Sequence, residues 1–392
     1  MNIINPNDPT AILLLCVAVL SFIILIVHYQ MVYMRVPRRY RQQKDNPPQP
    51  DHDLPGVSVV LTVHNDAKWL RESLPYLLEQ DYPSYEVVVV DFVSQDDTAD
   101  VLKLCARYYS RLKMVLFQKD INAYRGKKYP LSIGIKSAQH DIILLSEAEC
   151  VPKDFNWIRR MVEGYTSEKT KIVLGYSGIN QKKSLFNALQ VFDNLEYHLR
   201  YMASALSGRP YTGVSCNLSY RRSFFFDQGA FYNHLTFAQG ADDIFVNQNA
   251  TKENTSVVLA PESFTFTDAQ PSLGKWMRMR RDRRATRFTY SLRQRLHLAG
   301  YPFVVMCFYA SFIALFQLHY AAWQIIVPLV VIEWAWQIFT LHYATKHFGV
   351  KRLHWFAPFF EIYFLFANTI CALTPLSIKG KRLKRRKKWK NN

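Results

Sequence analysis

Residues 140–151 read HDIILLSEAECV, a short apolar run that ends in two closely spaced acids. The apolar part, 142–145, predicts a strand buried on both faces of an α/β sheet. Glu147 and Glu149 follow at positions i and i+2, which point to the same side of an extended chain. Ligands of open α/β sheets bind at the carboxyl ends of strands, so these acids are candidate ligands of a hard divalent cation carrying a diphosphate. The alternative is a pair of solvated loop acids.

Predicted strands and helices alternate on both sides of this run. β-branched or apolar strands are expected at 57–63, 85–91, 114–117 and 141–145, with helices opening at Asp66, at 96–98 and over 127–138. This alternation predicts an α/β fold with a mostly parallel sheet and right-handed crossovers. Further elements are expected as helices at 155–165, 185–206 and 242–249, and as strands at 171–176, 213–220 and 257–259.

Apolar stretches at both ends of the chain predict membrane helices. Residues 11–32 have about the ~20-residue length that crosses a bilayer, and basic residues follow, which predicts a retained anchor with a cytoplasmic carboxyl end. Further apolar stretches cover 303–318, 321–341 and 355–373. If the sheet and the basic tail both face the cytoplasm, an even number of crossings separates them. We therefore expect a hairpin of the first two stretches and an interfacial or re-entrant third stretch, which carries Glu361.

The net charge of +18 is concentrated beside these stretches. Basic clusters at 35–44, 275–295 and 379–390 favour anionic lipid headgroups as partners, and no nucleic-acid-binding signature is present. The expected organisation is an N-terminal anchor (1–34), a basic Pro-rich linker (35–54), the α/β domain (55–270), a basic interfacial helix (271–300), C-terminal membrane segments (301–375) and a basic cytoplasmic tail (376–392). The six cysteines form no C-x-x-C, which predicts neither a disulfide framework nor a zinc site and fits a reducing compartment.

Three blocks follow one another in the first part of the predicted sheet: VSVVLTVHND (57–66), LLEQDYP (77–83) and EVVVVD (86–91). They resemble the opening of a known family, the membrane-bound family 2 glycosyltransferases. GKK (126–128) resembles its Gly-Lys step, SEAE (146–149) occupies the place of its D-x-D motif, and GADDIF (240–245) resembles the motif that supplies the catalytic base. The resemblance covers about residues 55 to 290. It implies a GT-A-type fold that binds a nucleotide-sugar donor.

The resemblance also implies roles for individual residues. The expected donor-binding residues are Thr62, His64, Asp66, Asp91, Lys127, Lys128 and Glu147. Asp91 can accept a hydrogen bond from a uracil-type N–H or instead cap its strand, and the two lysines can offset diphosphate charge or simply begin a solvated helix. Glu147 and Glu149 are expected to hold Mg²⁺ or Mn²⁺.

Asp242 is the expected general base and Asp243 a supporting acid, with helix capping as the alternative for either residue. The region of Trp276, Arg280, Arg281 and Arg283 loosely resembles the family's Q-x-x-R-W region and is expected to contact acceptor or phosphate; a lipid-facing basic helix is the alternative.

The expected function is transfer of a sugar, with inversion, to a lipid-linked or cell-envelope glycan at the cytoplasmic face of the membrane. Transfer of single sugars is favoured over processive synthesis. Some positions depart from the family pattern: the metal motif has glutamates, Phe92 follows Asp91, Ala241 precedes the base, and Met279 stands where glutamine is expected. These departures motivate a second hypothesis, a catalytically weakened or inactive membrane partner of a glycan assembly complex.

Overall fold

The computed structural model describes residues 8–43, 54–117, 126–232, 240–318 and 323–373. The chain divides into two compact units, which we call the helical unit (1–38 and 290–375) and the sheet unit (39–289 and 376–392). Half of the expected Pro-rich linker (44–53) and the whole basic tail lie outside the described residues.

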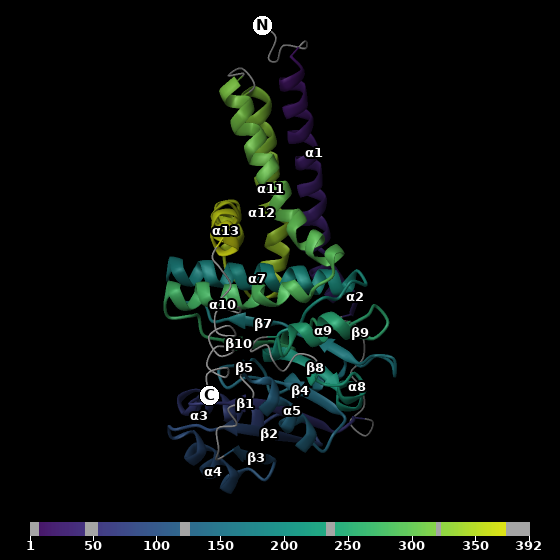
Figure 1. Ribbon diagram of the computed structural model, residues 1–392, viewed down its shortest axis with the longest axis vertical. Helices are drawn as coiled ribbons and strands as arrows, with labels where there is room; N and C mark the ends of the chain where they lie inside the picture. Colours follow the sequence, from purple (N-terminus) through teal and green to yellow (C-terminus); the bar gives the residue numbers. More distant parts are fainter. Residues whose placement is uncertain (1–7, 44–53, 118–125, 233–239, 319–322, 374–392) are drawn as a thin grey trace, which may run out of the picture. The chain divides into compact units, whose positions relative to one another are not determined.

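The sheet unit is built on a mostly parallel sheet (Figure 1). Its seven described strands follow the order β3-β2-β1-β4-β8-β6-β9. The strand β8 runs antiparallel to both of its neighbours, β4 and β6, whereas β1 pairs in parallel with β2 and β4. The strands are β1 (Val57–Val63), β2 (Tyr85–Phe92), β3 (Leu112–Phe117), β4 (Ile142–Leu145), β6 (Ile172–Leu174), β8 (Leu218–Arg221) and β9 (Thr255–Val257). The predicted α/β class with a mostly parallel sheet is confirmed.

A small three-stranded sheet adjoins the predicted metal motif in sequence. Its strands, in the order β5-β10-β7, are β5 (Val151–Pro152), β10 (Thr265–Thr267) and β7 (Ser177–Ile179). The strand β5 begins two residues after Glu149 and pairs antiparallel with β10, which pairs in parallel with β7. This register places the residues that follow β10 and β7 at the same end of the small sheet as Glu149, which precedes β5.

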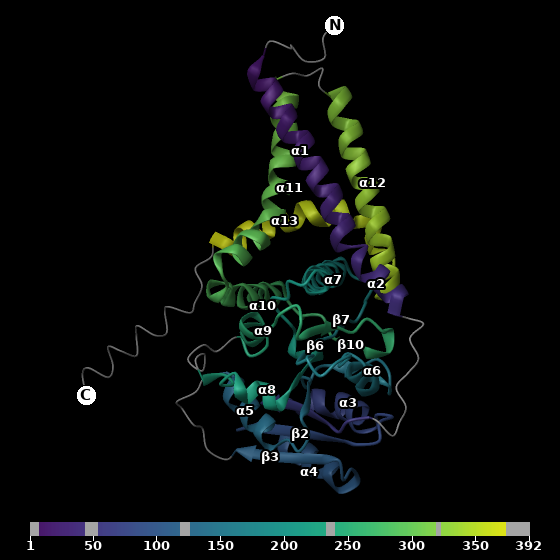
Figure 2. The same cartoon turned by 90° about the vertical axis from the view of Figure 1, so that its right-hand side faces the viewer.

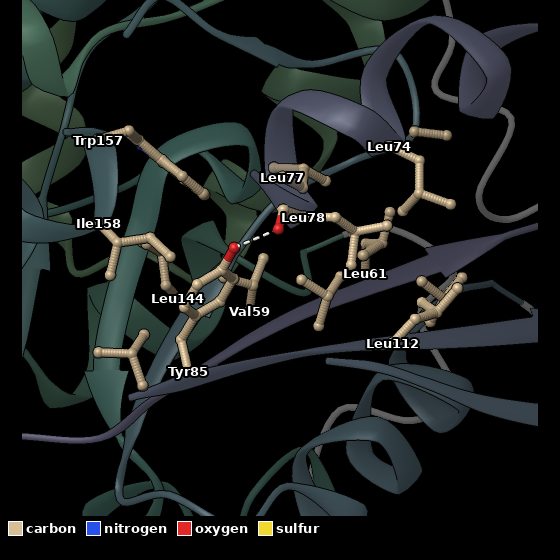
Figure 3. Packing of buried hydrophobic residues seen from close by; sticks show 14 of the residues in the cluster. Val59, Leu61, Leu74, Leu77, Leu78, Tyr85, Leu112, Leu144, Trp157 and Ile158 are labelled. Carbon is tan, nitrogen blue, oxygen red and sulfur yellow. Dashed lines mark hydrogen bonds between the residues drawn. The ribbon is translucent and has the colours of Figure 1, made fainter. Parts of the chain in front are cut away.

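Helices on both faces bury the central strands, which explains their continuous apolar sequence. Figure 3 shows one of these cores, where Leu74 and Leu77 pack with Val59 and Trp157. The Tyr85 hydroxyl is buried in this core and donates a 2.5 Å hydrogen bond to the Leu78 carbonyl. The helices of the sheet unit are α3 (Ala67–Leu78), α4 (Thr98–Tyr108), α5 (Lys128–Ser137), α6 (Trp157–Val162), α7 (Leu185–Leu206), α8 (Arg222–Asp227), α9 (Asp243–Asn249) and α10 (Leu273–Ala285), and α2 (Arg35–Gln43) spans the division between the units.

The helical unit contains α1 (Pro9–Val32), α11 (Leu292–Leu318), α12 (Trp323–His347) and α13 (Ala357–Leu373). Three described helices are long and apolar enough to cross a membrane: Pro9–Gln42, Leu292–Leu318 and Trp323–His347. The 17-residue α13 is not among them; it runs crosswise to α1 and α11 in Figure 2 and is seen end-on in Figure 1. One N-terminal and two C-terminal long apolar helices are therefore confirmed, as expected of a multi-pass membrane protein.

The basic helix expected over 271–300 is interrupted in the structure. Helix α10 ends at Ala285, a 3₁₀ turn covers Thr286–Thr289, and α11 begins at Leu292. The Thr289 hydroxyl donates to the Thr286 carbonyl at 2.8 Å, whereas the Thr286 hydroxyl donates to Asp243. Such local side-chain bonds to the backbone compete with regular helix hydrogen bonding. The basic stretch is thus divided between two helices and two units.

The cysteine spacing predicted no disulfide framework, and the described residues contain a single disulfide. Cys150 and Cys216 form a disulfide across 66 residues of sequence, with their Cα atoms 5.9 Å apart. Antiparallel pairing of β4 with β8 brings the two segments together, because Leu145 lies opposite Leu218. This pairing is a tertiary property, and cysteine spacing carries no sign of it.

Leucine substitutions on two neighbouring helices test the core assignment. Leu74→Ala removes a fully buried side chain of α3 and should lower the free energy of unfolding of the sheet unit by about 2–5 kcal/mol. Leu104→Ala on α4 is the matched control, because Leu104 is 54% exposed, and its effect should stay within about 0.5 kcal/mol. Denaturant unfolding of the full chain in detergent measures both changes, and equal losses would contradict the packing described.

Candidate active site

Two turns at the carboxyl ends of β1 and β2 form one end of the site. Asn65 and Val93 have left-handed backbones, with φ of 58° and 59°, an unfavourable conformation for a β-branched residue such as Val93. Side chains connect the turns: the Asn65 N–H donates to the Ser94 hydroxyl at 2.9 Å, and the Gln95 N–H donates to the Asn65 side-chain oxygen at 2.7 Å. Thr62 is half-buried just before the first turn. These hydrogen bonds hold the two strained turns together at the end of the sheet.

Three other predicted donor residues lie on these turns. His64 is exposed, and its Nδ1 lies 2.7 Å from the Phe92 carbonyl oxygen. The Asp66 carboxylate accepts the His64 N–H at 2.9 Å. Asp91 is buried, and its Oδ1 accepts the Ser94 N–H at 3.2 Å. The structure therefore brings His64, Asp66 and Asp91 together at the end predicted to bind the nucleotide base.

Asp66 does not cap α3 through its side chain, contrary to expectation. The carboxylate of Asp96 takes that role and accepts the Ala67 N–H at 3.2 Å. Burial, followed by the charges of Asp96 and Glu147, raises the pKa of Asp66. The Asp66 carboxylate thus lies within electrostatic reach of the predicted metal motif.

The two glutamates at the end of β4 share their surroundings with Lys127. Gly126 adopts a left-handed φ of 91°, and Lys127 directly follows it at the start of α5. The Lys127 ammonium forms an ion pair with Glu147. Burial and the charge of Glu147 raise the pKa of Glu149 to about 7, although Lys127 acts in the opposite direction. Glu147 and Glu149 therefore lie close together, and the single positive charge of Lys127 does not fully offset their two negative charges.

This donor set fits a hard divalent cation. Carboxylate oxygens are the ligands that Mg²⁺ and Mn²⁺ prefer, and a cation would favour the charged forms of both glutamates. Among the described residues, no group of three or more His, Cys, Asp or Glu side chains could hold a metal ion. Glu147 and Glu149 would therefore need further oxygen ligands, such as the oxygens of a diphosphate.

Asp242 is held at the start of α9 by two backbone N–H groups. Gly240 precedes it with a left-handed φ of 86°, and a Cβ at Gly240 would lie 2.4 Å from the Ile244 side chain. The Asp242 carboxylate accepts the Asp243 N–H at 3.0 Å and the Ser215 N–H at 3.0 Å. These bonds fix a half-buried carboxylate that remains partly open to solvent.

Asp243 lies deeper than Asp242 and is only 8% exposed. Its Oδ2 accepts a hydrogen bond from the Thr286 hydroxyl, whereas its Oδ1 has no hydrogen-bond partner among the described residues. Burial, followed by the charge of Asp242, raises the pKa of Asp243 to about 7. Lys128, 1% exposed, is attracted by both aspartates, but burial lowers the pKa of its ammonium to about 8. The two adjacent lysines therefore interact mainly with different acids. Lys127 forms an ion pair with Glu147, and Lys128 is attracted by Asp243 and Asp242.

Two of the predicted acceptor residues are engaged within the protein. Trp276 is fully buried in α10, with its ring 5.7 Å from that of Phe186 on α7. Arg280 is 7% exposed and forms a 2.5 Å ion pair with Asp193, also on α7. In this structure both residues join α10 to α7.

Arg283 and Arg281 are better placed to meet a ligand, since both are only half-buried. The Arg283 guanidinium lies 4.7 Å from the centre of the Tyr197 ring. The charges of Asp243 and Asp242 both act on Tyr197, which locates Arg283 near the base region.

Sequence reasoning missed three residues that shape the site. Thr286 and Ser215 bond to the two aspartates from segments 43 and 27 residues away in sequence. Asp268 follows β10, accepts hydrogen bonds from Asn180 and Lys182 at 3.0 Å each, and contributes to the raised pKa of Glu149. None of the three lies in a motif that indicates its contacts.

Comparison with known proteins identifies relatives that are glycosyltransferases. Glycosyltransferase AglE of Haloferax volcanii is 25% identical over 222 residues, which are 56% of this chain and 68% of AglE. Probable glycosyltransferase YdaM of Bacillus subtilis is 30% identical over 172 residues (43% of this chain, 38% of YdaM). Poly-beta-1,6-N-acetyl-D-glucosamine synthase of Staphylococcus epidermidis is 25% identical over 138 residues (35% of this chain, 32% of the synthase). The matches to the last two cover only about a third of each relative.

A solved structure confirms the GT-A-type fold. The mannosyltransferase PcManGT from Pyrobaculum calidifontis, in complex with GDP-Man and Mn²⁺, superposes with a TM-score of 0.52 at 18% identity, covering 85% of this chain and 99% of that one. The model of glycosyl transferase family 21 matches residues 13–373. The resemblance to glycosyltransferases seen in the sequence is thereby confirmed. The chain belongs to glycosyl transferase family 21.

Proposed function

We propose that this glycosyltransferase transfers a single sugar, with inversion, from a nucleotide-sugar donor to a hydroxyl of a lipid-linked or cell-envelope glycan at the cytoplasmic face of the membrane. One observation carries the proposal: Lys127 pairs with Glu147 and also lies within electrostatic reach of Asp242. Glu147, a candidate ligand of the metal that would carry the diphosphate, and Asp242, the candidate base, therefore belong to one site, as direct displacement requires.

The donor half of the site is assigned to the residues around the ends of β1, β2 and β4. Asp91 accepts an N–H of the nucleotide base, while His64 and Asp66 line the turn beside it. Lys127 leaves Glu147 to neutralise a phosphate oxygen. Glu147 and Glu149 would hold Mg²⁺ or Mn²⁺, which when bound stabilises the charge of the departing nucleoside diphosphate.

The acceptor half is assigned to the aspartates. Asp242 takes the proton of the acceptor hydroxyl, whose oxygen forms a bond to the anomeric carbon as the carbon–phosphate oxygen bond breaks on the opposite side. The N–H groups of Ser215 and Asp243 hold the base in position. Asp243 lies deeper than Asp242, accepts a hydrogen bond from Thr286 and, with Lys128, sets the charge around the base. Partial exposure of Asp242 and burial of Asp243 favour this order over the reverse.

A membrane-associated acceptor agrees with the three candidate membrane helices. Arg35, Arg38, Arg39 and Arg41 directly follow α1, which favours a cytoplasmic position for that end and contact with anionic headgroups. Half-buried Arg283 and Arg281 are retained as candidates for acceptor or phosphate contact. A polymer channel needs several spans, so three candidates among the described residues favour transfer of single sugars.

Substitution of the aspartates tests the assignment of the base. Asp242→Asn should lower kcat/KM by about 10²- to 10⁴-fold, because no other carboxylate takes the acceptor proton, with donor binding unchanged. Asp243→Asn should cost less. Nucleotide release with a panel of UDP- and GDP-sugars measures turnover, and calorimetry measures donor binding. Full turnover by both variants would refute the base assignment, and absence of donor binding by the wild type would favour the inactive-partner hypothesis.

The pKa of Asp243 predicts a pH-dependent effect on stability. In the unfolded chain this carboxyl has an ordinary pKa near 3.9, whereas in the folded state the pKa is about 7. The folded protein therefore binds the proton more tightly, and stability declines between about pH 4 and pH 7 as the buried charge forms. Asp243→Asn should raise Tm by several degrees at pH 8 and by little at pH 5.

Thermal unfolding of the full chain at both pH values measures this difference. Asp100→Asn, at a side chain that is 79% exposed and pairs with Lys103, is the control and should change Tm by the same small amount at both pH values. An Asp243→Asn variant less stable than wild type at pH 8 would show that the charged carboxylate is stabilised in the folded protein.

Metal dependence is tested at the glutamates. Mn²⁺ should increase the affinity of the wild type for UDP or GDP, and Glu147→Gln or Glu149→Gln should reduce that increase on the order of 10- to 100-fold, because each removes a ligand. Affinity without metal should remain. Calorimetry with Mn²⁺ and with EDTA measures both, and Glu72→Gln on the exposed side of α3 is the control. An unchanged Mn²⁺ effect in both variants would refute the metal assignment.

A further inference from the structure

A buried polar cluster joins the four helices of the helical unit. The Tyr29 hydroxyl of α1 lies 2.5 Å from an oxygen of Glu333 on α12 and 3.0 Å from an oxygen of Glu361 on α13. Tyr301 of α11 also donates a hydrogen bond to Glu361. Tyr29 and Glu333 are fully buried, and Glu361 is 6% exposed. Ionisable side chains inside membrane helices are costly and are commonly functional.

The cluster contains polar atoms that the described residues leave unpaired. Glu333 Oε2 is buried and has no well-aligned hydrogen bond among the described residues, and the Tyr309 hydroxyl lies close enough to interact with the Glu333 carboxylate. Gln337 is fully buried, and neither its amide oxygen nor its amide nitrogen has one. Gln337 follows Glu333 by four residues in α12, so the two side chains lie on the same helix face. A buried polar group without a partner is destabilising, which indicates that another group binds beside Glu333 and Gln337.

The charge of the cluster limits what that group can be. A phenol hydroxyl has one hydrogen to donate, yet the Tyr29 hydroxyl lies within hydrogen-bond distance of two carboxylates. The groups that act on Glu333 are the hydroxyls of Tyr29 and Tyr309, which carry no positive charge. An anionic ligand such as a phosphate is excluded by the two glutamates, because like charges repel strongly where water is scarce.

We propose that Glu333, Glu361 and Gln337 bind one hard divalent cation, with the Tyr29 hydroxyl beside it. Two carboxylates balance the charge of a divalent ion, and the amide oxygen of Gln337 adds a neutral ligand. The set contains only oxygen donors, which favours Ca²⁺, with its flexible coordination, over Zn²⁺. Bound there, the ion ties α12 to α13 and, through the tyrosines, to α1 and α11. None of these residues belongs to the donor or base site, so the proposal is independent of the proposed function.

The test uses the full chain in detergent, stripped with EDTA and carrying Glu147→Gln and Glu149→Gln to remove the donor-site metal ligands. Ca²⁺ is added at constant ionic strength, with Mg²⁺ and Na⁺ as separate arms. Calorimetry counts bound Ca²⁺, and thermal unfolding follows stability. We expect one Ca²⁺ per chain and a saturable rise in Tm, because a ligand that binds only the folded state stabilises it.

Two further substitutions locate the site. Glu333→Gln should abolish both the binding and the rise in Tm, and in EDTA it should be at least as stable as its parent, because it removes an uncompensated buried charge. Gln337→Leu keeps both carboxylates and should weaken Ca²⁺ binding about ten-fold, so it serves as the test if Glu333→Gln does not fold. Absence of Ca²⁺ binding, a response to Na⁺ or to pH alone, or binding unchanged by Glu333→Gln and Gln337→Leu would overturn the proposal. Wild-type nucleotide release tests the proposed function separately, so a failure of the Ca²⁺ proposal would leave the proposed function standing.

Discussion

Parallel pairing of β4 with β1 is the constraint on which the site depends. Val57 to Val60 lie opposite Ile142 to Leu145, and the Ser146 N–H extends the pairing to the Val60 carbonyl at 3.2 Å. Glu147 and Glu149 therefore emerge beside the turn that carries His64 and Asp66. On its other side β4 pairs with β8, which brings Ser215 and its hydrogen bond to Asp242 to the same strand end. The strand thus separates the proposed donor half of the site from the proposed acceptor half.

Crowded acids are the common feature of the two halves. Glu149 and Asp243 both have a pKa raised to about 7, in each case by burial and then by a neighbouring carboxylate. One lysine is assigned to each half, and one positive charge is too little for two carboxylates. Such a site is unfavourable for stability and favourable for binding, because positive charge or a proton relieves the repulsion. Divalent cations in the donor half and a transferred proton in the acceptor half suit this arrangement.

The sequence was sufficient for elements whose apolar pattern is local. The bounds of β1 and α7 agree with the expected 57–63 and 185–206, and β4 differs by one residue. A 3₁₀ turn with a Thr289 hydroxyl bond to the Thr286 carbonyl separates α10 from α11, where composition alone predicted a continuing helix. The Cys150–Cys216 disulfide and the contacts of Thr286, Ser215 and Asp268 depend on strand pairing and chain crossings. The order of the motifs could therefore predict which acids meet, whereas the groups that hold them could not be predicted.

A crystallographic or cryo-EM structure of the protein with Mn²⁺ and a nucleoside diphosphate would test the central claim most directly. The account predicts Mn²⁺ between Glu147 and Glu149, identified by anomalous scattering in the crystal, with Lys127 moved from Glu147 to a phosphate oxygen and Asp242 facing the open side of the site. A bound diphosphate with the Lys127–Glu147 ion pair intact and no ion at Glu149 would contradict it.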